Sequence, residues 1–314
     1  MKIVSLLPSA TEIICALGLE TKLAGVTHEC DYPALVRRLP KVTRSLIPIS
    51  APSLEIDALV RERLDTRRAL YTLDLPLLQT LRPDLIVTQA LCGVCAVAEV
   101  EVRAAACSLP GNPRVINLEP RVLEDVYGCL REVAEAAGVG RQAARVIDSL
   151  AARVDVVDHR AAALPHKPRV ALLEWLDPPF SCGHWSPGLV RIAGGVEGLG
   201  GERQPSRRLR WDEVIAWQPE VVLIACCGFD VQRTLRDLAP LPAVPGWADL
   251  PAVRAGRVFV TDGSQYFSRP GPRLVDSLEI LAHALNPGVQ SLPDGIPPPL
   301  RVYASRSHGP AVFT

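Results

Sequence analysis

Apolar and polar positions alternate along the first half of the chain in a way that predicts strands followed by helices. The run 2–7 (KIVSLL) indicates a buried strand, and 8–18 (PSATEIICALG) has the spacing of a helix that ends at its glycine. Further apolar runs predict strands at 22–27, 84–88 and 113–118. Strands that alternate with helices are typical of an α/β fold with a parallel sheet.

The same alternation returns in the second half, after a long stretch with helical spacing. Residues 120–164 have the periodicity of a long helix, with the GVG stretch (138–140) as the place where it would break, and a new strand begins near residue 168. The segments 77–87 (LLQTLRPDLIV) and 214–224 (VIAWQPEVVLI) share one order of features: a helix, a polar residue, a proline, an acid and an apolar strand. This repeat predicts an α/β protein with two Rossmann-like lobes that have parallel sheets and are joined by a long connecting helix.

The domain boundaries follow from this pattern. We expect an N-terminal α/β lobe at 1–119, the connecting helix at 120–164, a C-terminal α/β lobe at 165–287 and a proline-rich tail at 288–314. Parallel strands with helical crossovers collect functional loops at the carboxyl ends of the strands. The sequence therefore predicts a ligand cleft between the two lobes, lined by those loops.

Polar, aromatic and sulfur-bearing side chains gather after the predicted strands. Aromatic rings there would form the walls of a binding pocket, and polar groups would be the hydrogen-bonding partners of its ligand. For each aromatic residue, packing at the edge of a lobe is the alternative role. The predicted ligand-binding residues are Ser9, His28, Glu29, Gln89, Cys92, Glu174, Trp175, Phe180, His184, Trp185, Phe229, Asp262, Ser264, Tyr266 and Phe267.

The stretch TQALCGVCAV (88–97) places Cys92 and Cys95 three positions apart after an apolar run. Together with His28 and Cys30 they would make a closed tetrahedral zinc site if the loops of the first lobe converge. The same pair could instead be redox-active thiols of a thiol- or cofactor-dependent enzyme, or plain cleft-lining thiols. The sequence contains no phosphate-binding loop, nucleophile elbow or zinc-protease helix, so it indicates no particular reaction and we do not predict an enzyme.

Composition limits the partners and the location. The chain has 34 basic and 34 acidic residues, so its formal net charge is zero and favours neither a nucleic-acid partner nor an anionic membrane. No apolar run approaches the roughly 18 residues that would insert into a membrane. The first residues lack the pattern of a signal peptide, and nine cysteines at irregular spacing do not form a secreted disulfide framework. We therefore predict a cytoplasmic protein, with a periplasmic one requiring an export route that the sequence does not show.

Taken in order, these motifs resemble one protein family. The stretches SLLPSATEIICALGL, LAGVTHECDYP, LRPDLIVTQ, IAGG, WDEVIAWQPEVVLIA and VRAGRVFVTDG, with the long central helix, are similar to helical-backbone substrate-binding proteins of ABC importers. Within that superfamily the chain looks most like the cobalamin (vitamin B12) and iron-complex branch. The resemblance implies two α/β lobes bridged by a stiff helix, with a small-molecule metal complex held in the cleft. A cobalamin or related corrinoid is the preferred ligand, and heme, a ferric siderophore or a divalent metal ion are the alternatives.

The resemblance also implies docking on an ABC permease through one acidic residue of each lobe, just before the Pro-acid-strand motif. In the second lobe Asp212 occupies that position. In the first lobe the same offset falls on Pro76, and Asp74 lies two residues further out. This displacement and the absence of a signal favour a cytosolic corrinoid-handling protein over a transport component.

Overall fold

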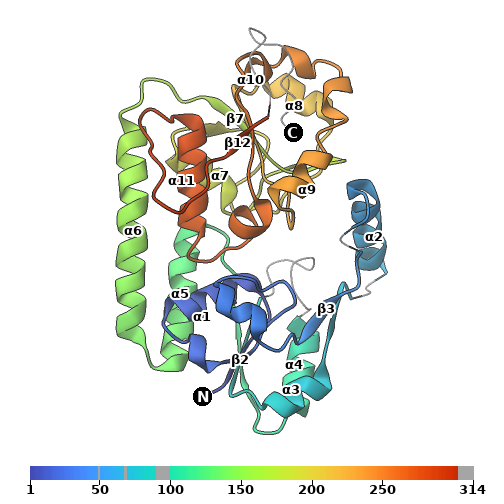
Figure 1. Cartoon of the computed structure of the whole chain (residues 1–314), viewed down its shortest axis with the longest axis vertical. Coiled ribbons are helices and arrows are strands. Elements are labelled where there is room, and N and C mark those ends of the chain that lie inside the picture. Colours follow the sequence, from blue (N-terminus) through green and yellow to red (C-terminus); the bar gives the residue numbers. More distant parts are fainter. Residues whose placement is uncertain (49, 67–68, 90–98, 303–314) are drawn as a thin grey trace. The chain divides into compact units, whose positions relative to one another are not determined.

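The computed structural model of the chain describes residues 1–48, 50–66, 69–89 and 99–302 (Figure 1). Its contacts divide it into two compact units. The first consists of Met1–Pro120 with Glu124–Ser149, and the second of Arg121–Leu123 with Leu150–Thr314. Cys92 and Cys95 lie outside the described residues, so the predictions for this pair concern a segment about which the structure gives no information.

A parallel sheet organises the first unit. Its strand order is β2 (Leu23–Gly25), β1 (Ile3–Ser5), β5 (Leu85–Thr88) and β6 (Arg114–Asn117), and each neighbouring pair is parallel. Every residue of β1 and β5 is buried, as expected for strands that are covered on both faces. Continuous apolar runs, rather than alternating ones, therefore identify these strands in the sequence.

Helices and a second, two-stranded sheet complete the first unit. The helices are α1 (Pro8–Ala16), α2 (Ser53–Asp65), α3 (Leu75–Leu81), α4 (Glu99–Ser108), α5 (Leu123–Ala137) and the beginning of α6 (Gly140–Ala162), with short 3₁₀ turns η1 (Glu20–Lys22) and η2 (Ala34–Arg38). The strands β3 (Thr43–Ser45) and β4 (Tyr71–Leu73) pair in antiparallel fashion, and α2 lies between them in the chain. The apolar core joins Val4 and Ile86 of the sheet to Leu78 of α3 and Val102 of α4.

The second unit is built on a mixed sheet. Three parallel strands form its centre: β7 (Arg169–Leu176), β10 (Val221–Ile224) and β11 (Val258–Val260). The short strands β8 (Pro179–Ser181) and β12 (Leu300–Arg301) extend it in antiparallel fashion, and β9 (Val196–Glu197) pairs with the beginning of β7. The pairing of β12 with β11 places part of the predicted proline-rich tail in the sheet.

Helices pack around this second sheet as well. They are α7 (Ser186–Ile192), α8 (Trp211–Trp217), α9 (Val231–Arg236), α10 (Pro251–Arg254), α11 (Leu274–Leu285), the 3₁₀ turns η3 (Leu241–Ala243) and η4 (Trp247–Asp249), and the π-helical turn η5 (Gly263–Phe267). Nearly every residue of α11 is buried, including Ser277 and Glu279 as well as its apolar side chains. It lies beside the second part of α6, and Arg153 of α6 is ion-paired with Asp276 and Glu279 of α11 (Figure 1).

The repeat seen in the sequence has the same structure in both units. The residues before the two prolines, Arg82 and Gln218, adopt left-handed backbone with φ of 49° and 51°, and each ends its helix. The acids after the prolines tie the new strand to the first strand of each sheet. Asp84 accepts a hydrogen bond from the Lys2 amide at 2.6 Å, and Glu220 accepts one from the Arg169 amide at 3.0 Å. The α/β prediction with parallel sheets is confirmed.

The predicted connecting helix is interrupted at its GVG stretch (138–140). Residues 120–164 form two helices, α5 and α6, instead of one. The break falls at Gly138, whose φ of +70° ends α5 in a conformation that favours glycine. The exact domain boundaries expected from the sequence stay a prediction. None of the helices within the described ranges is both long and apolar enough to cross a membrane.

Candidate functional site

A β-bulge at Glu174 shapes the carboxyl end of β7. The pairing of β7 with β8 shifts register between Leu173 and Trp175, so Glu174 is the extra residue. Its carboxylate is half-buried and accepts hydrogen bonds from the Gly183 amide at 3.3 Å, from the Ser186 hydroxyl at 3.4 Å and from the Ser206 hydroxyl. Glu174 therefore holds together three segments that are separate in sequence.

Two aromatic rings meet beside this bulge. The ring centroids of Trp175 and Phe229 lie 4.7 Å apart with a 38° angle between their planes, and the guanidinium carbon of Arg233 lies 4.3 Å from the centroid of Phe229. The indole nitrogen of Trp175 donates to the Asp177 carbonyl at 3.1 Å. The opposite partner of Trp175 on β8 is Phe180. The structure thus brings three of the predicted aromatic residues into one row.

His184 and Trp185 follow, at the beginning of α7. Their rings stack with centroids 5.5 Å apart, and His184 has a φ of +50°. Burial lowers the pKa of His184, and the nearby Arg121 acts in the same direction, so its imidazole is neutral at physiological pH. Its Nδ1 atom is buried and has no hydrogen-bond partner within the part of the chain that the structure describes.

The π-helical turn after β11 carries the remaining predicted residues. Asp262 caps it by accepting hydrogen bonds from the amide and side chain of Gln265, at 2.7 and 2.8 Å. Burial raises the pKa of Asp262. The amide of Ser264 donates to the Phe229 carbonyl at 3.0 Å, and the guanidinium carbon of Arg273 lies 5.4 Å from the Tyr266 ring centroid. These bonds join the turn to the row of aromatic residues.

The first unit contains a smaller cluster around His28. The Nδ1 atom of His28 lies 2.8 Å from the Thr43 hydroxyl, and its ring centroid lies 5.7 Å from that of Tyr71. Burial lowers the pKa of His28, and Lys41 adds to the effect. Glu29 beside it is exposed.

The other predicted residues of the first unit are more enclosed. Ser9 is buried within α1, and Gln89 is buried directly after β5. The Oε1 atom of Gln89 accepts no hydrogen bond within the described residues. Gln89 and His28 both follow strands of the same parallel sheet, as the sequence predicts.

The zinc prediction depended on Cys30 as a thiolate ligand. The Cys30 thiol is buried, and it lies 3.1 Å from the hydroxyls of both Thr11 and Thr27. Burial raises its pKa, which favours the protonated thiol. No three His, Cys, Asp or Glu side chains among the described residues are grouped to hold a metal ion.

The two acids predicted to dock on a permease have different surroundings. Asp74 is the N-cap of α3 and accepts a hydrogen bond from the Leu77 amide at 2.9 Å. Asp212 lies in the first turn of α8, its side chain is 69% exposed, and Arg210 pairs with it at 3.0 Å. Asp212 is therefore the more accessible of the two.

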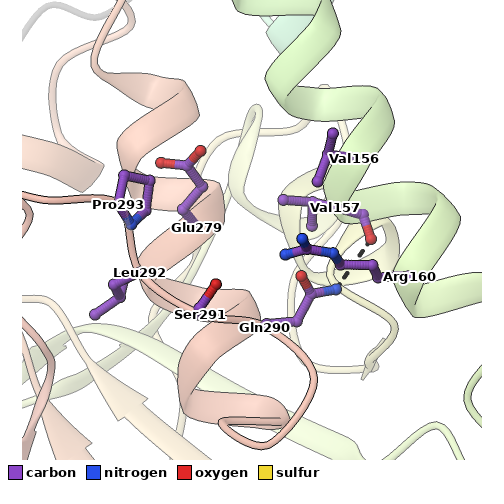
Figure 2. Close-up of a pocket in the computed structure, with 8 residues that line it drawn as sticks. All are labelled: Val156, Val157, Arg160, Glu279, Gln290, Ser291, Leu292 and Pro293. Carbon is purple, nitrogen blue, oxygen red and sulfur yellow. Dashed lines mark hydrogen bonds between the residues drawn. The ribbon is translucent and has the colours of Figure 1, made fainter.

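A pocket of about 220 Å³ lies in the second unit between α6, α11 and the segment 290–293 (Figure 2). Figure 2 shows Gln290 with its side chain on the Val157 carbonyl, at 3.0 Å, and none of the predicted site residues lines this pocket. Pockets for drug-sized ligands span roughly 300–1,000 Å³. This pocket is thus too small for a corrinoid or a heme.

Sequence reasoning missed several residues of these clusters. Arg233 and Arg273 lie on aromatic rings, Ser206 binds Glu174, and Thr43 and Tyr71 surround His28. Each comes from a segment distant in sequence from its partner, except Arg233 and Arg273. Those two arginines follow predicted aromatic residues at close spacing, which was the signal available to find them.

Comparison with known proteins identifies the architecture. The sequence pattern of periplasmic binding proteins matches residues 3–264. The chain belongs to the periplasmic binding protein family. It is 22% identical over 297 residues to an ABC transporter substrate-binding lipoprotein of Bacillus subtilis, covering 91% of this chain and 80% of the relative. It is 24% identical over 285 residues to a vitamin B12-binding protein of Vibrio cholerae, covering 88% and 86%. Among solved structures, a periplasmic heme-binding protein of Pseudomonas aeruginosa superimposes with a TM-score of 0.70 at 21% identity, over 97% of this chain and 99% of that one.

Membership of this family confirms the resemblance found in the sequence and corrects one prediction. Periplasmic binding proteins are solute-binding proteins rather than enzymes, and those of ABC transporters work with permease components. The prediction of a cytoplasmic location is wrong, because the family and its lipoprotein and vitamin B12-binding relatives point to a periplasmic or extracellular location. The prediction depended on the pattern of the first residues, the cysteine spacing and the displaced docking acid, whereas the family match covers residues 3–264.

Proposed function

We propose that this periplasmic binding protein binds cobalamin or a related corrinoid for an ABC importer, without catalysing a reaction. The observation that supports this ligand is the row formed by Phe180, Trp175 and Phe229 at the carboxyl ends of β7 and β10. We call these three residues the aromatic row. A corrinoid is large and nearly flat, so it can cover such a row and bury the apolar faces of the rings.

Polar groups around the aromatic row suit the edges of the same ligand. A corrinoid carries amide side chains at its periphery, which both donate and accept hydrogen bonds. Three side chains beside the aromatic row can bind such amides. The carboxylate of Glu174 is an acceptor, the hydroxyl of Ser264 can donate or accept, and the side-chain amide of Gln265 can do both. The vitamin B12-binding relative, which matches most of both chains, supports the same ligand.

Heme is the second candidate, and His184 is the observation that favours it. Its half-buried imidazole is neutral at physiological pH, as iron ligation requires. The heme-binding structure from Pseudomonas aeruginosa has the same fold. Replacement of His184 by alanine would then remove the red-shifted spectrum of bound heme while leaving corrinoid binding intact.

A ligand screen tests both candidates. Purified protein is titrated with cyanocobalamin, hemin, a ferric hydroxamate and zinc chloride, and the melting temperature and the ligand absorbance are recorded. We expect cyanocobalamin to raise the melting temperature, because a ligand that binds only the folded state stabilises it by mass action. The variant Trp175→Ala should lose most of this increase while the unliganded protein melts at nearly the same temperature, since Trp175 is half-exposed.

The outcomes separate the candidates. If hemin alone raises the melting temperature, heme is the ligand and the corrinoid proposal is wrong. If only the hydroxamate or only zinc raises it, both the corrinoid and the heme proposals are wrong. No response to any corrinoid at the highest soluble concentration contradicts the proposed function. An unchanged response in Trp175→Ala would show that the aromatic row is not where the ligand binds.

A further inference from the structure

Arg208 lies directly beside the aromatic row. The segment that contains it runs antiparallel to β8: the Ser181 amide donates to the Arg207 carbonyl at 3.0 Å, and the Leu209 amide donates to the Pro179 carbonyl at 2.7 Å. These two bonds flank a bridge in which Arg208 is the direct partner of Phe180. Direct partners in an antiparallel pair present their side chains on the same face, about 5 Å apart.

The same register rule extends across the sheet. Phe180 is also the direct partner of Trp175 on β7, so Arg208, Phe180 and Trp175 share one face. Trp175 contacts Phe229, on which Arg233 lies. The aromatic row therefore has an arginine at each end.

The two end arginines differ in their ionic partners. Arg233 is ion-paired with Asp237 at 2.5 Å, and both side chains are largely buried, so its charge is already compensated. Arg208 is exposed, and within the described ranges no carboxylate pairs with it. Its neighbours are not in this situation: Arg207 is paired with Glu213 at 2.9 Å and Arg210 with Asp212 at 3.0 Å. Of the three arginines in this short segment, only Arg208 has no carboxylate partner within the described residues, so its charge is the one left to pair with a ligand.

We propose that Arg208 binds an anionic group at the edge of the ligand that covers the aromatic row. This inference depends on the proposed function and narrows its substrate class to flat macrocycles with a peripheral phosphate or carboxylate. The nucleotide loop of cobalamin contains a phosphodiester, and heme has two propionates, so both candidates carry such a group. A planar guanidinium forms two parallel hydrogen bonds to either anion.

Matched ligands and matched variants test this assignment. Cyanocobalamin is compared with dicyanocobinamide, which has the corrin ring without the phosphate, and hemin with its dimethyl ester. The variant Arg208→Gln removes the available guanidinium, and Arg210→Gln is the control because it removes the same charge from a paired arginine of the same segment. We expect Arg208→Gln to weaken cyanocobalamin binding about tenfold or more, as for a charged hydrogen bond.

The control ligands and the control variant should not show this loss of affinity. Dicyanocobinamide should bind wild-type protein and Arg208→Gln equally, and Arg210→Gln should bind cyanocobalamin like the wild type. If heme is the ligand, hemin loses affinity in Arg208→Gln while the dimethyl ester does not. Added salt should weaken the binding of the anionic ligand in the wild type more than in Arg208→Gln.

Equal affinity of wild type and Arg208→Gln for the anionic ligand would overturn the assignment and leave the proposed function standing. The assignment would also be wrong if Arg208→Gln lost the same affinity for the ligands with and without the anionic group. Arg208 would then contact the macrocycle rather than the anionic group. A wild-type protein that binds neither corrinoid nor heme would overturn both proposals. Because Arg208 is exposed, the variants should melt within a few degrees of the wild type, which excludes misfolding as the cause.

Discussion

The indole nitrogen of Trp185 donates a hydrogen bond to the main-chain carbonyl of Phe267 at 2.9 Å. Trp185 precedes α7 and Phe267 ends the π-helical turn after β11, so one buried bond joins two segments that are 82 residues apart. Both side chains are buried, at 8% and 2% exposure. Both were predicted as ligand contacts, which stays a prediction, and the bond between them holds two of the predicted site segments together.

Removing this bond should destabilise the protein without removing the aromatic ring. We expect Trp185→Phe to lower the free energy of unfolding by about 1–3 kcal/mol, because the carbonyl of Phe267 is left buried without its donor. Urea unfolding at equilibrium measures the change. A variant as stable as the wild type would show that water or another donor replaces the indole.

Stability should also depend on the protonation of His28. Folding lowers its pKa below the ordinary value of 6.5, chiefly through burial, so the unfolded chain binds this proton more readily. The contribution of neutral His28 is therefore complete above pH 6.5 and is lost as the pH falls through the lower pKa of the folded state. We expect His28→Asn to lose less stability than the wild type between about pH 8 and pH 5.

Urea unfolding across that pH range measures the effect of His28. His184 also has a lowered pKa, so His184→Asn should likewise reduce the dependence of the unfolding free energy on pH. The double variant should show the smallest dependence on pH. Parallel pH profiles for His28→Asn and wild type would contradict this account.

Arg153 should be important for holding α6 against α11. Its guanidinium binds Asp276 and Glu279 at 2.5 Å, and these two carboxylates are only 17% and 8% exposed. Replacement by alanine leaves two partly buried acids without their cation, which should cost about 3 kcal/mol. Arg160→Ala is the control on the same helix: this residue is exposed, and its loss should change stability by about 0.5 kcal/mol or less. Equal effects of the two variants in thermal unfolding would show that the ion pairs contribute little.

Gly263 is required by close packing at the beginning of the π-helical turn. A Cβ atom at this position would lie 2.2 Å from the Cys226 carbonyl oxygen and 2.6 Å from the Ala225 carbonyl carbon, both of which are main-chain atoms of or beside β10. We expect Gly263→Ala to destabilise the protein by about 2 kcal/mol or more and to weaken ligand binding, since the turn must move away. A Cβ atom at Gly140 would have no atom within 4 Å, so Gly140→Ala should change neither stability nor ligand binding in this way. Calorimetry of the two variants makes the comparison.

Most of the fold could be predicted because its signals are local. Buried parallel strands such as 3–5 and 85–88 are continuous apolar runs, and the repeat around Pro83 and Pro219 recurs with the same backbone in both units. The break between α5 and α6 falls at the GVG stretch (138–140), where the glycines of the sequence indicate it, and Gly138 has a φ of +70°. The cytoplasmic location was wrong because it gave the pattern of the first residues and the cysteine spacing more weight than the family, whose match covers residues 3–264.

The sequence by itself determined the α/β class, the repeat, the family and the strand ends at which functional side chains gather. The α/β class, the repeat and the strand ends depend on residue spacing within short segments, which local periodicity encodes, whereas the family was found through the resemblance of the ordered motifs. Only the tertiary structure decided which side chains meet. The bulge at Glu174 sets the register of Trp175 opposite Phe180, and a second pairing brings Arg208 beside that ring. These contacts join residues up to 54 positions apart, from Trp175 to Phe229, and no local pattern specifies the strand register that creates them.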